Sequence, residues 1–321
     1  MKSETFDVLY KNDNYDLQDF LKNHPGGTNY LKPFEHKDVA KRMIDTYHSK
    51  AAFYLLKDYN KNGKEANRND DLEKLVNWSK PMLAQVGNLG TNYNEWVTSP
   101  VDRELRLFGN YILENLTITP WYVVPAIWIP IIIYLSRLGV DRYIQLSNGR
   151  ETLLNLSPAL SIITYFVLGI IIWSLLEYSL HRWIFHIEPS GRSKIVIYFH
   201  FAIHGLHHKV PFDTRRLVFP PFPAAIIAII FYWLFSFILP DYSIVLIFAG
   251  ALTGYLTYDM IHYYLHYGSP KETSYFYELK RYHNQHHFAH HDLGFGISSV
   301  IWDKIFGTAV HLKKLKIPIK W

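Results

Sequence analysis

The chain has 321 residues, a formal net charge of +5 and no cysteine. The absence of cysteine excludes disulfide bonds and thiolate metal sites, so a transition metal would be bound by carboxylates or by some of the 17 histidines. Hydrophobic residues make up 49% of the sequence, yet the mean hydropathy is close to zero, which indicates strongly apolar blocks beside strongly polar ones. The charge is mild and no basic nucleic-acid-binding motif is present, so no nucleic acid partner is expected.

The first 59 residues predict a small polar domain, the head. Its N-terminal segment lacks the apolar core of a signal peptide, so we expect the head to stay in the cytosol. From Tyr15 to Gly27 the sequence is YDLQDFLKNHPGG, in which proline fixes φ and the paired glycines permit positive φ where the chain would wrap a flat cofactor. A second histidine, His48, follows His24 by 24 positions.

This pattern resembles the haem-binding turn of cytochrome b5, and His24 and His48 have the spacing of its two haem ligands. The resemblance implies a small α+β head that binds haem b through both histidines. Two axial imidazoles saturate the iron, which suits electron transfer rather than oxygen binding. The chain begins close to the segment that matches Asp7–Asp16, so we expect a head shortened at its N-terminus. The alternative is a vestigial b5 fold that only docks a partner.

Residues 60–118 predict a linker and a juxtamembrane adaptor. Asn60 to Asp71 is charged, rich in asparagine and poor in large apolar side chains, which is typical of a linker. Leu72 to Leu116 mixes aromatic, charged and turn residues and allows no finer assignment than an adaptor.

Residues 119–321 predict a membrane-embedded domain with four spans. A bilayer core of about 30 Å needs about 20 apolar residues in a helix. Four stretches contain no charged residue and meet or approach this length: Thr119–Ser136, Thr152–Leu176, Leu217–Leu239 and Tyr242–Tyr258. The last is short, and Asp259 and Met260 would extend it into a cavity lined by protein. Buried helices of a soluble protein are the alternative, but they would leave too little polar surface to cover four such stretches.

The connections between the stretches predict the topology. Pro240-Asp241 allows only a tight hairpin between the third and fourth stretches. With four spans, the head, the segment after the second span and the C-terminus share one side of the membrane. Basic residues outnumber acidic ones between His181 and Arg216, so the positive-inside rule places that side in the cytosol.

Ten histidines form the strongest functional pattern, just after the second and fourth stretches. An HX4H pair and an HXXHH triad follow the second stretch, and an HX3H pair and another HXXHH triad follow the fourth: His181, His186, His204, His207, His208, His262, His266, His283, His286 and His287. Positions three and four apart share one helix face, so these spacings aim imidazoles at one point, while the five-residue spacing of HX4H fits a helix end or an unwound turn. Ten ligands exceed what one ion accepts, so we predict two ions. Neutral imidazole suits iron, zinc, copper or nickel.

The histidine pattern resembles the fatty acid hydroxylase superfamily of membrane oxygenases, which includes fatty acid 2-hydroxylases, sterol methyl oxidases and sterol desaturases. Flanking segments resemble the 2-hydroxylase branch: EYSLHRWIFH from Glu177, HGLHHKVP from His204, RLVFPP from Arg216 and LGFG from Leu293. The resemblance covers about Leu107 to Thr308 and also the head. It implies a mainly α fold in which a four-span bundle carries a cytosolic helical cap with the di-metal site.

The same resemblance implies a non-haem di-iron monooxygenase that uses O₂ and two electrons to hydroxylate C2 of a long acyl chain for sphingolipid synthesis. Electrons would come from NAD(P)H through a separate reductase, such as cytochrome b5 reductase, and then through the head. The implied location is the endoplasmic reticulum membrane, and zinc is expected to substitute for iron in purified protein. Free fatty acid, acyl-CoA and ceramide stay open as substrates, and sterol oxidation or desaturation is the alternative reaction. A metal transporter would need ionisable residues within the spans, and the four stretches have none.

A few residues near the ten histidines are candidates for supporting roles. Asp259 lies three positions before His262 at a membrane edge, where an isolated carboxylate is costly, so we expect it to accept an N–H from a ligand and fix its tautomer. Its alternative is a carboxylate at a helix end in water. Tyr258 and Glu177 are weaker candidates of the same kind. His200 shares a helix face with His204 and is expected to support it, whereas His290 and His291 lie in a polar turn and are expected to face solvent.

Overall fold

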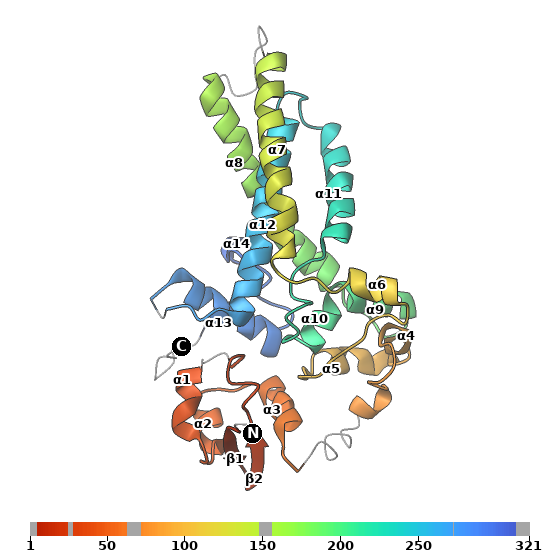
Figure 1. Ribbon diagram of the computed structural model, residues 1–321, viewed down its shortest axis with the longest axis vertical. Helices are drawn as coiled ribbons and strands as arrows, with labels where there is room; N and C mark the ends of the chain where they lie inside the picture. Colours follow the sequence, from red (N-terminus) through yellow and green to blue (C-terminus); the bar gives the residue numbers. More distant parts are fainter. Residues whose placement is uncertain (1–4, 25–27, 63–71, 148–155, 272, 313–321) are drawn as a thin grey trace.

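The computed structural model describes residues 5–24, 28–62, 72–147, 156–271 and 273–312. It is an elongated molecule in which the apolar helices α7, α8, α11 and α12 form one end and the head forms the other (Figure 1). Between them lies the cap, built from residues 194–209 and 275–306 together with the adaptor, residues 73–116. The predicted linker falls largely on residues 63–71, which lie outside the described residues.

The head combines a two-stranded hairpin with short helices. Strands β1 (Asp7–Tyr10) and β2 (Asp13–Asp16) are antiparallel, with Asp7 opposite Asp16. Both loop residues, Lys11 and Asn12, have positive φ, as a two-residue hairpin turn requires. Helices α1 (Thr28–Leu31), α2 (Ala40–Asp45) and α3 (Lys50–Leu56) follow, and the Ser49 hydroxyl caps α3 by accepting the Ala52 N–H. The result is the small α+β unit that the sequence predicts.

The adaptor is a folded part of the cap rather than a spacer. Its short helices are α4 (Leu83–Val86), α5 (Tyr93–Val97) and α6 (Tyr111–Leu116). Tyr93 and Trp96 are completely buried and pack with Phe201, which lies three residues before the first histidine triad. The aromatic residues of this segment therefore form a hydrophobic core against the histidine-bearing helices, which sequence patterns did not reveal.

Among the described residues, three helices are long and apolar enough to cross a membrane: α7 (Val123–Ser147), α8 (Pro158–Ser179, continuing to Phe185) and α12 (Ile244–Tyr267). The third predicted stretch forms the shorter apolar helix α11 (Pro221–Ser236). Helix α7 runs past the predicted end of its stretch because its backbone hydrogen bonding continues into charged residues. The predicted start of the second stretch, at 152–155, lies outside the described residues.

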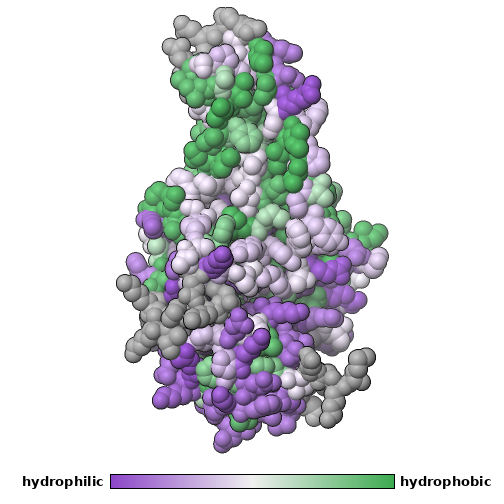
Figure 2. Space-filling view, turned by 60° about the vertical axis from the view of Figure 1, so that its left-hand side comes forward, coloured by the Kyte–Doolittle hydropathy of each residue, from purple (hydrophilic) through white to green (hydrophobic). Residues whose placement is uncertain are grey.

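Helix α12 is the centre of the bundle, and α7 and α8 pack against it. Figure 2 shows hydrophobic surface concentrated over the helical end of the molecule and hydrophilic surface over the cap and head. Glycines allow α8 and α12 to approach closely: a Cβ at Gly250 would lie 1.9 Å from the Phe166 carbonyl oxygen, and one at Gly169 would lie 2.0 Å from the Ile247 carbonyl oxygen. Small residues have this role in membrane helix packing.

We expect Gly250→Ala to destabilise the bundle. The added methyl group would have to push α8 and α12 apart, and overpacking of this kind costs about 1–3 kcal/mol. Thermal unfolding in detergent measures the change, with Gly109→Ala as a control for added bulk, because the nearest atom to a Cβ at that position, Pro81 Cγ, lies at an ordinary contact distance of 3.4 Å. An unchanged melting temperature for Gly250→Ala would show that the two helices are not closely packed in the protein.

Candidate metal centre

The two histidine pairs lie at the ends of the apolar helices α8 and α12, and the two triads lie in the cap beside them. Helix α8 continues into a π-helical turn, Leu180–Phe185, and the His186 N–H donates to the His181 carbonyl at 3.0 Å. This i→i+5 hydrogen bond brings the two histidines of HX4H onto one face, as the prediction of an unwound turn requires. The first triad spans a second π-helical turn, Phe201–Gly205, and α10 (Leu206–Lys209). The second pair lies on α12 and the second triad on α13 (Tyr275–Phe288).

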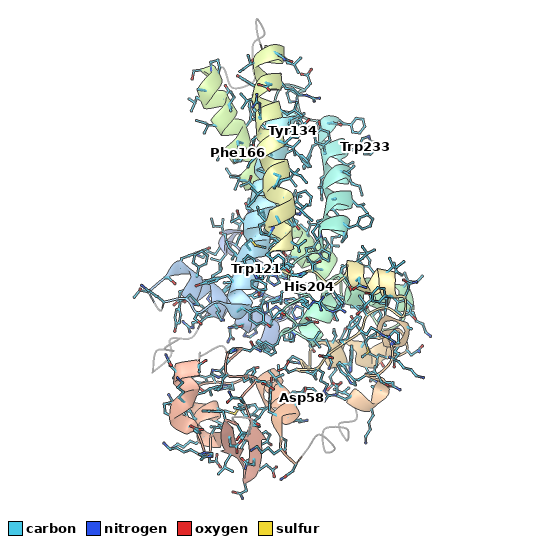
Figure 3. All side chains as sticks on the ribbon, in the orientation of Figure 1. Asp58, Trp121, Tyr134, Phe166, His204 and Trp233 are labelled. Carbon is cyan, nitrogen blue, oxygen red and sulfur yellow. The ribbon has the colours of Figure 1, made fainter. Side chains whose placement is uncertain are left out.

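The ten histidines come together in two adjoining groups. One group contains five residues whose ligand atoms lie within 4.8 Å of one another: His207, His262, His266, His283 and His287. The other contains four that meet the same limit: His181, His186, His204 and His286. The tenth, His208, lies beside the second group, with its Nε2 3.0 Å from His204 Nε2. Figure 3 shows His204 in the cap, below the helices that carry Tyr134, Phe166 and Trp233.

The histidine motifs form two halves of the domain, residues 181–208 and residues 262–287. The middle histidine of each triad joins the group formed mainly by the other half. The His207 side chain contacts His262 and His287 of the other half, with Nε2–Nε2 distances of 3.1 and 3.0 Å. His286 lies on α13, but its side chain packs against His181 and His186, with ring centres 4.9 and 4.6 Å from those of the two residues. Each group is therefore completed by one residue from the opposite half, and neither half forms its group alone.

The nitrogen spacing fits metal coordination. His204 Nε2 lies 3.1 Å from His181 Nε2 and 3.1 Å from His186 Nε2. Two imidazole nitrogens bound at right angles to one ion, each about 2.1 Å from it, are about 3.0 Å apart. The spacing thus matches an ion with ligand angles near 90°, as in five- or six-fold coordination.

Backbone carbonyls fix the tautomers of three of these histidines. The Nδ1–H groups donate to the carbonyls of nearby loops: His181 to Phe295 at 2.6 Å, His286 to Leu293 at 2.8 Å and His262 to Leu217 at 3.1 Å. A carbonyl can only accept, so Nδ1 carries the proton and Nε2 presents its lone pair to the cluster. His286 Nε2 is buried with no hydrogen-bond partner, and such an orphan nitrogen is costly unless an ion binds it.

Two buried carboxylates anchor the loop that contains the carbonyls of Leu293 and Phe295. Glu177 accepts the N–H groups of Ile297 and Ser298 at 3.0 and 2.7 Å. Asp303 on α14 (Ile301–Phe306) accepts those of Phe295 and Gly296 at 2.9 and 2.8 Å. The loop that orients His181 and His286 is therefore held at four consecutive N–H groups, and Asp303 is a supporting residue that the sequence did not suggest.

Asp259 has a different partner from the one expected. The prediction that it accepts a ligand's N–H is wrong, because its carboxylate accepts the backbone N–H of Phe219 at 3.0 and 3.2 Å. The alternative of a carboxylate in water is also wrong, since the residue is only 1% exposed. Phe219 lies two residues after Leu217, whose carbonyl accepts from His262, so the Asp259 carboxylate binds the loop that orients this histidine. Tyr258 stacks parallel to the His262 ring, with centres 6.2 Å apart.

The histidines flanking the groups divide as follows. His200 lies beside the first triad, and its Nδ1 is 2.6 Å from the buried Tyr93 hydroxyl. His290 is exposed, as expected. His291 was expected to face solvent, but its ring lies 5.6 Å from that of His208 because the chain turns back after α13. His208 itself stacks on His287, which joins the two groups.

The electrostatics of the cluster favour neutral, metal-binding imidazoles. Burial, followed by the proximity of other histidines, lowers the pKa of His204, His207 and His287 well below its usual value. The rings therefore keep their lone pairs at neutral pH. The chemistry of the donor set, its spacing and the orphan nitrogen of His286 all fit two transition-metal ions.

A buried ion pair connects the first triad to the adaptor. Lys209, directly after His208, is 0% exposed and donates to Glu73 at 2.6 Å and to the carbonyls of Ser99 and Trp96. Burial lowers the pKa of Lys209 to about 8, although Glu73 acts in the opposite direction. The same Glu73 accepts the hydroxyl of Tyr54 in the head at 2.7 Å. A lysine and a glutamate in polar segments gave no sign of burial in the sequence.

The head brings its two predicted haem ligands together in one cavity. The ring centres of His24 and His48 lie 6.2 Å apart with an angle of 27° between the ring planes, and both residues line the cavity. Imidazoles on opposite sides of one ion, each bound about 2 Å away, have ring centres about 6 Å apart. His48 Nδ1 donates to the Met43 carbonyl at 3.1 Å, so its Nε2 lone pair is available for a metal. Burial lowers the pKa of His48, which keeps the ring neutral. Residues 25–27 of the predicted turn lie outside the described residues.

Fold and site together define a histidine-rich membrane protein with a cytochrome b5-like head, and comparison with known proteins agrees. The family model described as "Fatty acid hydroxylase" matches residues 166–308. The model described as "Cytochrome b5-like Heme/Steroid binding domain" matches residues 3–75.

Individual relatives narrow the family. The chain is 40% identical to fatty acid 2-hydroxylase of Rattus norvegicus, over 92% of this chain and 89% of the relative. It is 39% identical to dihydroceramide fatty acyl 2-hydroxylase FAH2 of Arabidopsis thaliana, over 74% and 94%. The solved structure titled "Full length scs7p (only hydroxylase domain visible)" is similar with a TM-score of 0.67 at 30% identity, over 85% of this chain and 98% of that chain. The chain belongs to the fatty acid 2-hydroxylase family, whose members are hydroxylating oxidoreductases.

Proposed function

We propose that this protein is a membrane-bound di-iron monooxygenase that hydroxylates C2 of long-chain fatty acyl groups and so supplies 2-hydroxy acyl chains for sphingolipids. The observation that carries the proposal is the pair of imidazole groups completed crosswise by His207 and His286. Ten neutral nitrogens in two sets leave each of two ions enough ligands to stay bound and room for an oxygen ligand. The names of the relatives supply the substrate class.

In this proposal the five-residue group around His207 holds one ion, and the group around His204, with His208, holds the other. Iron bound there would supply the activation of O₂ and the removal of hydrogen from C2. Zinc could occupy the same nitrogens in purified protein. The chain's own task is to hold the imidazoles, through carbonyls that Glu177, Asp303 and Asp259 fix in place. The packed ring of Tyr258 beside His262 limits movement of that ligand.

The head is proposed to bind haem b through His24 and His48 and to pass on electrons. The neighbouring rings, the tautomer set by Met43 and the apolar lining of the cavity support this role. Two histidine ligands leave the iron no site for oxygen, so the head would carry electrons only. NAD(P)H would supply them through a separate reductase of the cytochrome b5 reductase type.

We further propose that the chain crosses the endoplasmic reticulum membrane four times, and that the short helix α11 crosses it in addition to the three long helices α7, α8 and α12. At 1.5 Å per residue the 16 residues of α11 reach about 24 Å, short of a bilayer core of about 30 Å, so its flanking apolar residues would complete the crossing. Phe237 and Ile238, directly after α11, are 71% and 78% exposed, as lipid contact would require. The cap, the head and both termini would then face the cytosol.

We expect the protein to form 2-hydroxy acyl sphingolipids in a host that lacks its own 2-hydroxylase. Mass spectrometry of sphingolipids, free acids and acyl-CoA pools measures the product and shows which form carries it first. Product should disappear with His204→Ala and fall with His24→Ala, while His36→Ala, an exposed histidine of the head, should behave as wild type. A new double bond or an oxidised sterol from well-expressed, iron-loaded protein would reject the proposed reaction.

A further inference from the structure

The cavity that holds His24 and His48 is not closed by the head alone. Part of its wall comes from the hydroxylase domain: Phe212, Asn284, Gln285, Phe288 and Ala289. The last four lie on or directly after α13, the helix whose opposite face carries His283, His286 and His287. Helix α13 therefore separates the head's cavity from the metal centre by its own thickness, and Figure 1 shows it between the head and the apolar helices.

A series of aromatic contacts crosses this boundary. Within the head, the Phe20 ring lies edge-on to His24, with centres 5.8 Å apart. Phe20 meets Phe212 at 5.5 Å, and Phe212 stacks on Phe288 at 6.3 Å and 19°. Phe288 in turn is 6.0 Å from the ring of its neighbour His287. Each ring touches the next, so the series runs from a head histidine to a member of the five-residue group.

Polar contacts next to the series hold the two domains in this position. Asp58 in the head accepts from the Arg103 guanidinium at 2.6 Å and from the Asp102 N–H at 3.0 Å. The Tyr59 hydroxyl donates to the Asp102 carboxylate, and the Tyr59 ring packs on Phe20 at 5.2 Å. The Asp58 and Arg103 side chains are only 8% and 25% exposed, so solvent screens this pair less than a surface pair. Figure 3 labels Asp58 where head and cap meet.

We propose that the head is docked in its electron-transferring position, and that Phe212 and Phe288 form the contact through which electrons pass from the head's haem to the metal centre at His287. The inference rests on the proposed function, in that it takes the head to bind haem and the cluster to bind iron. One electron leaves a ferrous haem, which becomes ferric, and reduces one ferric ion of the cluster to ferrous. No proton or atom crosses the contact. An NAD(P)H-dependent reductase restores the ferrous haem, and two such transfers provide the two electrons that the hydroxylation consumes.

The rate of electron transfer depends on the distance between donor and acceptor and on the packing of the atoms between them. Electronic coupling falls steeply across gaps between molecules and less steeply through atoms in contact. The series replaces a gap between two domains by ring-to-ring contacts on both sides of Phe212. Leucine at Phe212 or Phe288 keeps an apolar side chain in the cavity wall but removes the ring that makes these contacts.

The test uses the full-length protein in detergent, loaded with haem and ferric iron and mixed anaerobically with enough dithionite to supply one electron per haem. Stopped-flow absorbance follows the reoxidation of ferrous haem, which needs no substrate turnover. We expect a first-order rate that does not depend on protein concentration, and a rate about tenfold lower in Phe212→Leu and Phe288→Leu at unchanged haem and iron content. Phe276→Leu is the matched control, because Phe276 is on the same helix but packs on Tyr264. Arg103→Gln, which weakens the docking without touching the aromatic series, should also slow the transfer.

The outcomes separate this inference from the proposed function. Wild-type protein that binds no haem or no iron would overturn the proposed function, and the inference with it. Wild-type protein that transfers electrons, together with Leu variants that transfer equally fast, would overturn the aromatic contact alone. A rate that rises in proportion to protein concentration would show transfer between molecules and would overturn the docked position. Protein loaded with zinc in place of iron should show no haem reoxidation.

Discussion

His286→Ala is expected to abolish 2-hydroxylation and to lower the metal content of the protein from about two ions per chain towards one. Among the described residues, His286 is the member of the group of His181, His186 and His204 that comes from α13, and its buried Nε2 has no hydrogen-bond partner. Mutation of a residue that only orients a ligand typically lowers metal affinity or activity by about 10–100-fold. Removal of a ligand itself should therefore lower activity by more than about 100-fold. Inductively coupled plasma mass spectrometry gives the metal content, and sphingolipid analysis gives the activity.

The crossed arrangement makes a paired experiment possible. His207→Ala should deplete the other group in the same way, and the double variant should lose both ions. His290→Ala is the control, since His290 is exposed only four residues after His286. If either single variant retained two ions and wild-type activity, the crosswise completion of the groups would be refuted.

Asp259→Ala is expected to reduce activity and metal affinity by about 10–100-fold, the range typical of residues that orient metal ligands. Without the carboxylate, the Phe219 N–H loses its acceptor, and the loop that presents the Leu217 carbonyl to His262 is released. Asp259→Asn should retain most of the function, because its amide oxygen can still accept the Phe219 N–H. Competition with a chelator measures metal affinity alongside activity.

The comparison of the two variants identifies how Asp259 acts. A positioning role predicts a large loss for alanine and a small one for asparagine. Equal losses would show that the charge of the carboxylate is required, which contradicts a role through the loop alone. Asp141→Ala, at an exposed aspartate near the end of α7, controls for the loss of an acidic residue at a membrane edge.

The sequence predicted the components of the site better than their arrangement. Histidine spacing pointed to the nine members of the two groups and to His208 beside them, because residues three, four or five apart share a face of a regular helix or a π-helical turn. Spacing could not assign His207 and His286 to the opposite groups, since that depends on how two helices from distant parts of the chain pack. Similarly, the interval between His24 and His48 indicated a pair, and the structure placed the rings 6.2 Å apart.

The atoms that orient the histidines could not be predicted from the sequence, for a different reason. The acceptors that orient His181, His262 and His286 are backbone carbonyls, and a carbonyl has no residue type to recognise in a sequence. The adaptor was equally obscure, because its buried Trp96 and Tyr93 lie in short helices without a long apolar period. Only the fold shows that this segment packs on the helix of the first triad.

The π-helical turn at Leu180–Phe185 explains how two unequal sequences form comparable halves of one centre. The first pair has four residues between its histidines and the second has three. In a regular helix one additional residue would rotate everything beyond it by about 100°. Here the π-helical turn, closed by the hydrogen bond from the His186 N–H to the His181 carbonyl, contains the extra residue without rotating the helix beyond it. Deleting a single residue between these histidines is therefore expected to shorten the turn to the HX3H spacing of the second pair and to leave both imidazoles on one face of a regular helix.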